Sequence, residues 1–170
     1  MSFAINYMSI MATKNCIIDT CIFAELLKQY DFGYPNTQIR VSGLVSHSIA
    51  KEINKCIEYE GSNGYVIISV FAIVEIVNKF NEIFNGTNFT IDNFFNFIEQ
   101  QPSWLLIENF DKAVVLHLLD VPCKNLAGES ISSDDAIHIA TAINRGEPVN
   151  FCTSDGKLIR LNIDNITFID

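Results

Sequence analysis

The sequence is short of basic residues and lacks long apolar runs, and each absence narrows what the chain can be. It has 170 residues, with 11 Lys and Arg against 20 Asp and Glu, and a formal net charge of -9. This balance argues against a broad basic groove that binds nucleic acid through counterion release alone. It leaves room for carboxylates gathered around a metal ion, which also make a protein acidic. The most apolar stretch, residues 64–77, contains Glu75 and is too short to span a membrane.

Several motifs of known chemistry are also missing. The sequence contains no H-E-x-x-H, no P-loop and no dinucleotide-binding glycine pattern. Its five cysteines form no C-x-x-C pair and have no zinc-finger spacing. An odd, scattered set of cysteines without an export signal is typical of reduced thiols, so we expect a cytoplasmic protein. Residues 1–11 lack the basic start and cleavage pattern of a signal peptide, and we expect them to form a flexible tail.

Length and composition favour one folded domain over residues 1–170. A chain of this size buries enough surface to form a substantial core. Apolar residues make up 49% of the sequence and charged residues 18%. The apolar share is high for a lone soluble domain, which indicates a covered face or a homodimer.

Short apolar runs alternate with amphipathic segments along the chain. The apolar runs predict strands at residues 16–18, 65–68, 104–107, 149–152 and 166–169. Helical spacing predicts helices at residues 20–30, 46–59, 69–84, 90–101, 109–119, 132–145 and 155–161, four of them capped by Ser69, Thr90, Asn109 and Ser132. Buried strands joined by helices are typical of a three-layer α/β/α fold with a parallel, roughly five-stranded sheet.

Acidic residues follow the predicted strands where a parallel sheet binds its ligands. Asp19 directly follows the first strand, and Asp155 follows the fourth by three residues. Glu75 lies in the second turn of the helix after the second strand, and Asp134 and Asp135 open the helix before the fourth. The carboxyl ends of parallel strands meet at one edge of the sheet, so these side chains can converge.

Each acid also has a local explanation. Glu75 interrupts an apolar run, where burial of a carboxylate is costly unless it is paired, and it can pair with Lys79 one turn further on. The remaining acids can cap helices or turns: Asp19, Asp134, Asp135 and Asp155. Local capping accounts for each acid alone, and their convergence at one edge is what favours a shared site.

The other titratable residues are expected to play lesser parts. His138 lies three residues after Asp135 on one helix face; it can contact the site, but we expect a packing residue. The basic residues nearest the predicted edge can position phosphates or remain solvated: Lys14, Lys28, Arg145, Lys157 and Arg160.

Four carboxylates at one point repel one another unless a cation balances them. Mg²⁺ and Mn²⁺ prefer oxygen ligands and retain water. Such an ion can activate a water for in-line attack on a phosphate ester. The pattern therefore predicts metal-dependent hydrolysis of phosphodiester bonds.

Four segments together resemble the PIN-domain nucleases. They are Cys16-Ile17-Ile18-Asp19-Thr20, Ile68-Ser69 with Glu75, Asp135-Ala136-Ile137-His138-Ile139-Ala140-Thr141-Ala142, and Thr153-Ser154-Asp155. They stand in the family's order, and the most similar subgroup is the VapC-like toxin ribonucleases. The resemblance implies the parallel α/β fold described above and an endoribonuclease that depends on Mg²⁺ or Mn²⁺. It also implies RNA as the substrate and an antitoxin protein as a partner.

The resemblance assigns roles to individual residues. It implies that the catalytic and metal-binding acids are Asp19, Glu75, Asp135 and Asp155. Asp135 is preferred to Asp134, a supporting residue, because it directly precedes Ala136. Thr153 or Ser154 matches the small hydroxyl residue before the last acid and would orient the attacking water.

Two positions depart from the family's pattern. Many members have Asn two residues after the first acid, where this chain has Cys21, and a further acid two residues after the last, where it has Lys157. Both departures favour an alternative, a PIN-like module that binds RNA or a protein without cutting. A haloacid-dehalogenase-like phosphatase is disfavoured, because Asp19-Thr20-Cys21 is not the D-x-D motif of that class.

Overall fold

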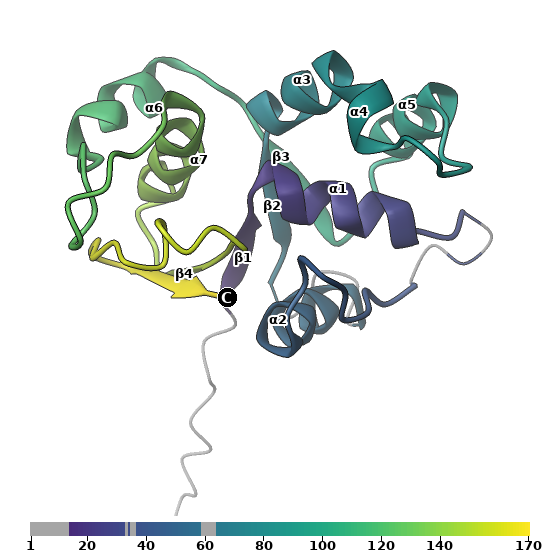
Figure 1. The fold of residues 1–170 in the computed structure, drawn as a ribbon, viewed down its shortest axis with the longest axis horizontal. Coiled ribbons are helices and arrows are strands. Elements are labelled where there is room, and N and C mark those ends of the chain that lie inside the picture. The colour runs from purple at the N-terminus through teal and green to yellow at the C-terminus, as the bar shows by residue number, and fades with distance from the viewer. Residues whose placement is uncertain (1–13, 33, 35–36, 59–63) are drawn as a thin grey trace, which may run out of the picture.

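The computed structural model describes residues 14–32, 34, 37–58 and 64–170 (Figure 1). The tail predicted at residues 1–11 lies outside the described residues, as does Tyr59 at the end of a predicted helix. None of the helices in the described ranges combines the length and apolarity that crossing a bilayer demands.

The strands of the described residues form one parallel sheet. They are β1 (Asn15–Ile18), β2 (Val66–Ser69), β3 (Leu105–Glu108), β4 (Val149–Cys152) and β5 (Ile166–Ile169). Their order is β3-β2-β1-β4-β5, and every neighbouring pair is parallel. The central strand is β1, in which Cys16 stands opposite Val66 on one side and Asn150 on the other. The prediction of a parallel, five-stranded α/β fold is confirmed.

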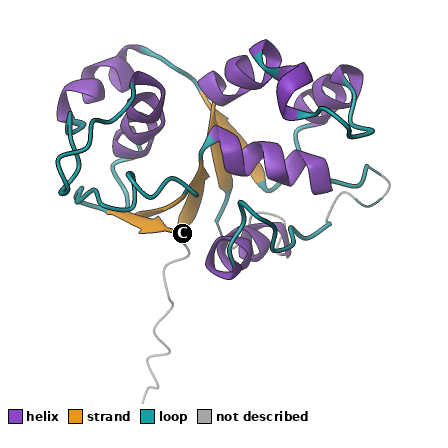
Figure 2. Cartoon of the chain, viewed as in Figure 1, coloured by secondary structure: helices purple, strands orange, loops and turns teal. Residues whose placement is uncertain are grey.

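Helices connect these strands and cover both faces of the sheet (Figure 2). They are α1 (Thr20–Gln29), α2 (His47–Glu58), α3 (Val70–Asn78), α4 (Phe80–Ile83), α5 (Ile91–Gln100), α6 (Lys112–His117), the 3-10 turn η1 (Leu118–Asp120) and α7 (Ser133–Asn144). The predicted caps Ser69, Thr90 and Ser132 each accept a hydrogen bond from a backbone N–H of the first turn. These hydroxyls satisfy donors that have no partner inside the helix.

Alternating strand residues supply two separate cores. Ile18 and Ile68 point into one core with the apolar faces of α1, α2, α3 and α5. Ile17 and Ile67 point to the opposite face of the sheet, into a core with α6 and α7. In Figure 1, α6 and α7 accordingly lie on one side of the sheet, and α1 and α2 lie on the other. Successive side chains of a strand face opposite ways, so strands with apolar residues on both faces require cover on both faces.

Three predicted helices differ from the structure. The helix predicted at residues 69–84 is interrupted at Lys79, whose backbone leaves the helical region and separates α3 from α4. The cap of α6 is Asp111 rather than Asn109, because the Asp111 carboxylate accepts from the N–H groups of Ala113 and Val114. The segment predicted as a helix at residues 155–161 forms turns instead.

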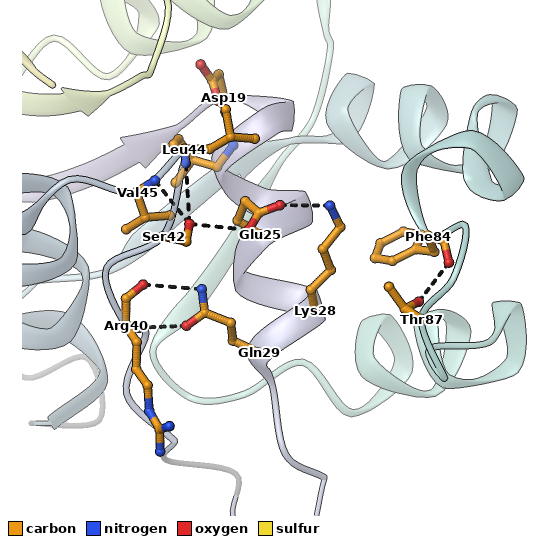
Figure 3. Close-up of polar contacts among 11 residues, drawn as sticks. Asp19, Glu25, Lys28, Gln29, Arg40, Ser42, Leu44, Val45, Phe84 and Thr87 are labelled. Atoms are coloured by element: carbon orange, nitrogen blue, oxygen red, sulfur yellow. Dashed lines mark hydrogen bonds and ion pairs between the residues drawn. The ribbon is translucent and has the colours of Figure 1, made fainter.

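Side-chain contacts hold α1 against the segment that precedes α2, as Figure 3 shows. The Gln29 amide donates to the backbone carbonyl of Arg40 at 3.2 Å and accepts from its N–H at 2.6 Å. The Ser42 hydroxyl donates to Glu25, which also pairs with Lys28. Asp19 stands at the opposite end of α1, with its side chain directed away from these contacts.

Candidate active site

A cavity of about 210 Å³ lies at the carboxyl ends of β1, β2 and β4. Its lining includes all four acids predicted as ligands, together with the predicted supporting residues Asp134 and Ser154. The full lining is Asp19, Thr20, Cys21, Glu75, Ser132, Asp134, Asp135, His138, Ser154 and Asp155. A larger cavity of about 410 Å³ near the end of α7 holds none of the predicted site residues. The chemistry of the lining therefore marks the smaller cavity as the candidate site.

Asp19 is the most buried of these acids, with 7% of its surface exposed. It caps α1 by accepting a hydrogen bond of 2.9 Å from the Ile22 N–H. Burial raises the pKa of its carboxyl to about 6, and the charges of Asp135 and Asp155 act in the same direction. Hydrogen bonds from Thr153 and Ile22 oppose this rise. Asp19 is thus both a helix cap and a buried carboxylate that lines the cavity.

Thr153 connects the first acid to the last. Its side chain is fully buried, and its hydroxyl lies near enough to the Asp19 carboxylate to lower the pKa of that acid. The same hydroxyl accepts a hydrogen bond of 3.0 Å from the Asp155 N–H. Asp155 in turn accepts from the backbone N–H of Lys157, and Ser154 is exposed at the cavity. Thr153 is therefore placed to orient Asp19, and Ser154 is the hydroxyl that solvent can reach.

Asp135 is held by the first turn of α7. Its N–H donates to the Ser132 hydroxyl at 3.1 Å, and that hydroxyl lies 2.5 Å from Asp135 Oδ2. The Ser132 hydroxyl thus caps α7 and also donates to the Asp135 carboxylate at the cavity. This differs from a capping box, in which that carboxylate would accept from the Ser132 backbone N–H. Asp134 also lines the cavity but is more exposed.

Glu75 comes from the second turn of α3 and accepts two hydrogen bonds. Thr20 donates to Oε2 at 2.6 Å, and Lys79 donates to Oε1 at 2.9 Å. Burial alone would raise the pKa of Glu75, but the bonds from Thr20 and Lys79 outweigh it and hold the pKa below its ordinary value. The predicted pair with Lys79 is present, and it coexists with the position of Glu75 in the cavity.

His138 contacts the site more closely than a packing residue would. It is 3% exposed, and its Nε2 lies 3.1 Å from the Thr20 hydroxyl. Its Nδ1 lies 3.0 Å from the hydroxyl of Ser69, the cap of α3. Burial lowers the pKa of the imidazole, which favours the neutral ring. The sequence offered a signal for this contact, since His138 stands one turn after Asp135 on α7.

The oxygen atoms of the cavity are of the chemical type that hard divalent cations such as Mg²⁺ prefer as ligands. The acids provide carboxylate oxygens, and the effect of Asp135 and Asp155 on the pKa of Asp19 is the repulsion that such a cation relieves. In the part of the chain that the structure describes, no three His, Cys, Asp or Glu side chains already form a group that could hold a metal ion.

The basic residues that could position phosphates are mostly occupied. Arg145 is paired with Glu108 and Glu147. Lys28 forms an ion pair with Glu25, and Arg160 forms one with Glu129. Lys14 donates a hydrogen bond to Thr167. Lys157 lies two residues after Asp155 and is exposed. Among the described residues it forms no ion pair, so its charge is available near the site.

Comparisons with known proteins show the fold. Neither protein-family models nor curated proteins match the sequence. A chain in the crystal structure of VapBC2 from Rickettsia felis, bound to a DNA fragment from their promoter, is 15% identical with a TM-score of 0.52. That match covers 91% of this chain and 96% of the other. A chain of DNA-bound VapBC from Salmonella typhimurium is 17% identical with a TM-score of 0.49, over 92% and 98% of the two chains.

The similarity to the Rickettsia felis structure agrees with the sheet described above. The chain has a VapC-like, PIN-domain α/β fold, as the sequence resemblance implied. At this identity the match concerns the fold, and the function has to be argued from the site itself.

Proposed function

We propose that this protein is a metal-dependent endoribonuclease. The observation that supports the proposal is the meeting of Asp19, Glu75, Asp135 and Asp155 in one cavity at the carboxyl edge of the sheet. These acids come from the start of α1, from α3, from α7 and from the loop after β4, which are far apart in sequence. Helix capping alone does not require them to share a cavity. The acids would hold Mg²⁺ or Mn²⁺, which would activate a water and stabilise the leaving oxygen of a phosphodiester.

The chain's own residues would orient the acids and the water. The Thr153 hydroxyl holds Asp19, and Thr20 holds Glu75. Ser154 presents an exposed hydroxyl at the cavity, where it can accept or donate a hydrogen bond to the attacking water. Lys157, two residues after Asp155 and exposed, would position a phosphate of the substrate.

An antitoxin protein is the proposed partner. The similar Rickettsia felis chain comes from a VapBC2 complex, and the resemblance in sequence also implies an antitoxin. Co-expression with the product of an adjacent small reading frame should yield a stable complex that does not cleave RNA. Size-exclusion chromatography of the chain alone would also test the predicted homodimer.

The direct test is cleavage of a circular single-stranded RNA, which only an endonuclease can open. We expect cleavage with Mg²⁺ or Mn²⁺ and none with EDTA. Asp19→Asn should abolish cleavage, because it removes a charge from the proposed ligands while keeping the cap. Asp111→Asn is the matched control, since Asp111 caps α6 away from the cavity. Full activity of Asp19→Asn would contradict the proposal.

The alternative function is a PIN-like module that binds RNA or protein without cutting. Cys21 favours it, because this residue lines the cavity where many family members have Asn. Partial burial and the charges of Asp19 and Glu75 raise the pKa of the Cys21 thiol to about 11, so it remains protonated at neutral pH. RNA binding without metal-stimulated cleavage would support this alternative.

A further inference from the structure

A buried chain of hydrogen bonds joins His138 to the acid site. It runs from Ser69 through His138 and Thr20 to Glu75. We propose that His138 is a positioning residue that directs the Thr20 hydroxyl onto Glu75 and so fixes the orientation of this carboxylate in the cavity. The inference rests on the proposed function, in which Glu75 is one of the metal-binding acids.

The direction of each hydrogen bond in this series follows from its last acceptor, the Glu75 carboxylate. Glu75 is a carboxylate that can only accept, so the Thr20 hydroxyl must donate to it across 2.6 Å. The Thr20 oxygen is then free only to accept, and His138 Nε2, 3.1 Å away, must carry the proton. A neutral ring with Nε2–H has a bare Nδ1, which accepts from the Ser69 hydroxyl at 3.0 Å.

The remaining contact of Ser69 agrees with this direction. Its oxygen accepts from the Ala72 N–H at 3.2 Å as the cap of α3, so its hydrogen remains available for His138. A protonated imidazole would donate from both nitrogens, and the Ser69 hydrogen would then lose its acceptor. With the neutral Nε2–H tautomer, every donor and acceptor in this series of hydrogen bonds has a partner.

This chain ties together four elements around the cavity. Ser69 ends β2, His138 belongs to α7, Thr20 opens α1, and Glu75 belongs to α3. Without the His138 proton, the Thr20 hydroxyl could rotate toward other acceptors, since a hydroxyl turns freely to suit its partners. The Glu75 carboxylate would then keep only the bond to Lys79, whose side chain is half exposed.

The tautomer provides a test that does not depend on catalysis. The ring-nitrogen chemical shifts of ¹⁵N-labelled protein distinguish the two neutral forms, and the His138→Asn variant identifies the His138 signals. We expect a neutral ring protonated at Nε2. A ring protonated at Nδ1, or a charged ring at neutral pH, would overturn the inference.

Paired substitutions separate the two ends of the imidazole. Gln places its amide near the position of Nε2 and can still donate to Thr20, whereas Asn reaches only the position of Nδ1 and Ser69. Loss of a residue that orients a ligand costs roughly 10–100-fold in metal affinity. In Mn²⁺ titrations we expect that weakening for His138→Asn and recovery of most of it in His138→Gln. Equal losses in both variants would refute the role of the Nε2 proton.

A double substitution distinguishes positioning from a general effect on the fold. If His138 acts through Thr20, then Thr20→Val combined with His138→Asn should weaken Mn²⁺ binding no more than Thr20→Val alone. Additive losses would refute the inference. Thr141→Val is the matched control, because Thr141 is a buried threonine of α7 whose hydroxyl donates to the Ile137 carbonyl within its own helix. Its Mn²⁺ affinity should equal that of the wild type.

Failure of the proposed function would look different. A wild-type protein that binds no Mn²⁺ and cleaves no RNA would contradict the metal-dependent nuclease. The tautomer measurement would still decide the direction of the hydrogen bonds, and a crystal structure of Thr20→Val would still show whether Glu75 changes its orientation.

Discussion

Asp19→Asn should make the metal-free protein more stable, although it should remove the proposed activity. The carboxyl has an ordinary pKa of 3.8 and a pKa of about 6 in the folded protein, mainly because it is buried. Folding therefore favours its protonated form, so the ionised carboxylate destabilises the fold. The difference corresponds to an upper limit of about 3 kcal/mol at neutral pH.

The pH dependence has a defined sign and range. The destabilisation is absent below pH 3.8, where the carboxyl is protonated in both states. It grows as the pH rises toward about 6, the folded pKa, and is constant above it. The stability advantage of Asp19→Asn should follow the same course. The amide retains the cap, because Asn accepts the Ile22 N–H as well as Asp does.

Urea unfolding with EDTA and with Mg²⁺ measures both parts of this argument. In EDTA at pH 7 the variant should unfold at higher urea than the wild type, and at pH 4 the two should nearly coincide. Saturating Mg²⁺ should stabilise the wild type, by about 2.7 kcal/mol at a hundredfold excess over Kd, and the variant less. Asp111→Asn, the exposed cap of α6, should change little at either pH. A variant less stable than the wild type in EDTA at pH 7 would refute the reasoning.

Two further predictions concern the start of β2 and the rim of the cavity. Gly64→Ala should cost about 1–3 kcal/mol in urea unfolding, because Gly64 has a φ of 105° and a Cβ there would lie 2.9 Å from the Lys14 carbonyl oxygen. Gly43→Ala, which meets no atom within 4 Å, should have a much smaller effect, and equal losses would show that the close approach is unimportant. Lys79→Gln should tighten Mn²⁺ binding up to about fivefold in calorimetric titrations, because it removes a positive charge next to Glu75. Unchanged affinity would argue that Glu75 is not a ligand; Lys55→Gln, in a similar helical ion pair, is the control.

The sheet was predictable because its strands are mostly apolar. Val66 and Ile67 face opposite cores, and a strand that buries both faces leaves few alternatives to a parallel sheet under helices. The caps Ser69 and Ser132 were predictable for a similar reason, since a hydroxyl before an apolar helix satisfies its first N–H groups.

The local errors arose where side chains compete for backbone groups. The apolar spacing around Leu158 and Leu161 predicts a helix, but Asp155 accepts the Lys157 N–H and favours a turn. Asp111 replaced Asn109 as a cap because both are good caps and spacing alone does not choose between them.

The meeting of the acids followed from sheet polarity, whereas the hydrogen-bond chain did not. Asp19 and Asp155 are placed by the ends of β1 and β4, which the strand pattern locates. The contacts of His138 depend on the rotation of α7 against β2, which helical spacing does not specify. The roles of these residues in catalysis remain predictions.

The position of β1 in the middle of the sheet has a consequence for synthesis of the protein. The ribosome makes β1 first, yet one flank of β1 is completed only by β4, the second-last strand. A nascent chain carries Asp19, Glu75 and Asp135 well before Asp155 emerges. The proposed cutting centre therefore assembles only after β4 and the loop that carries Asp155 have been made.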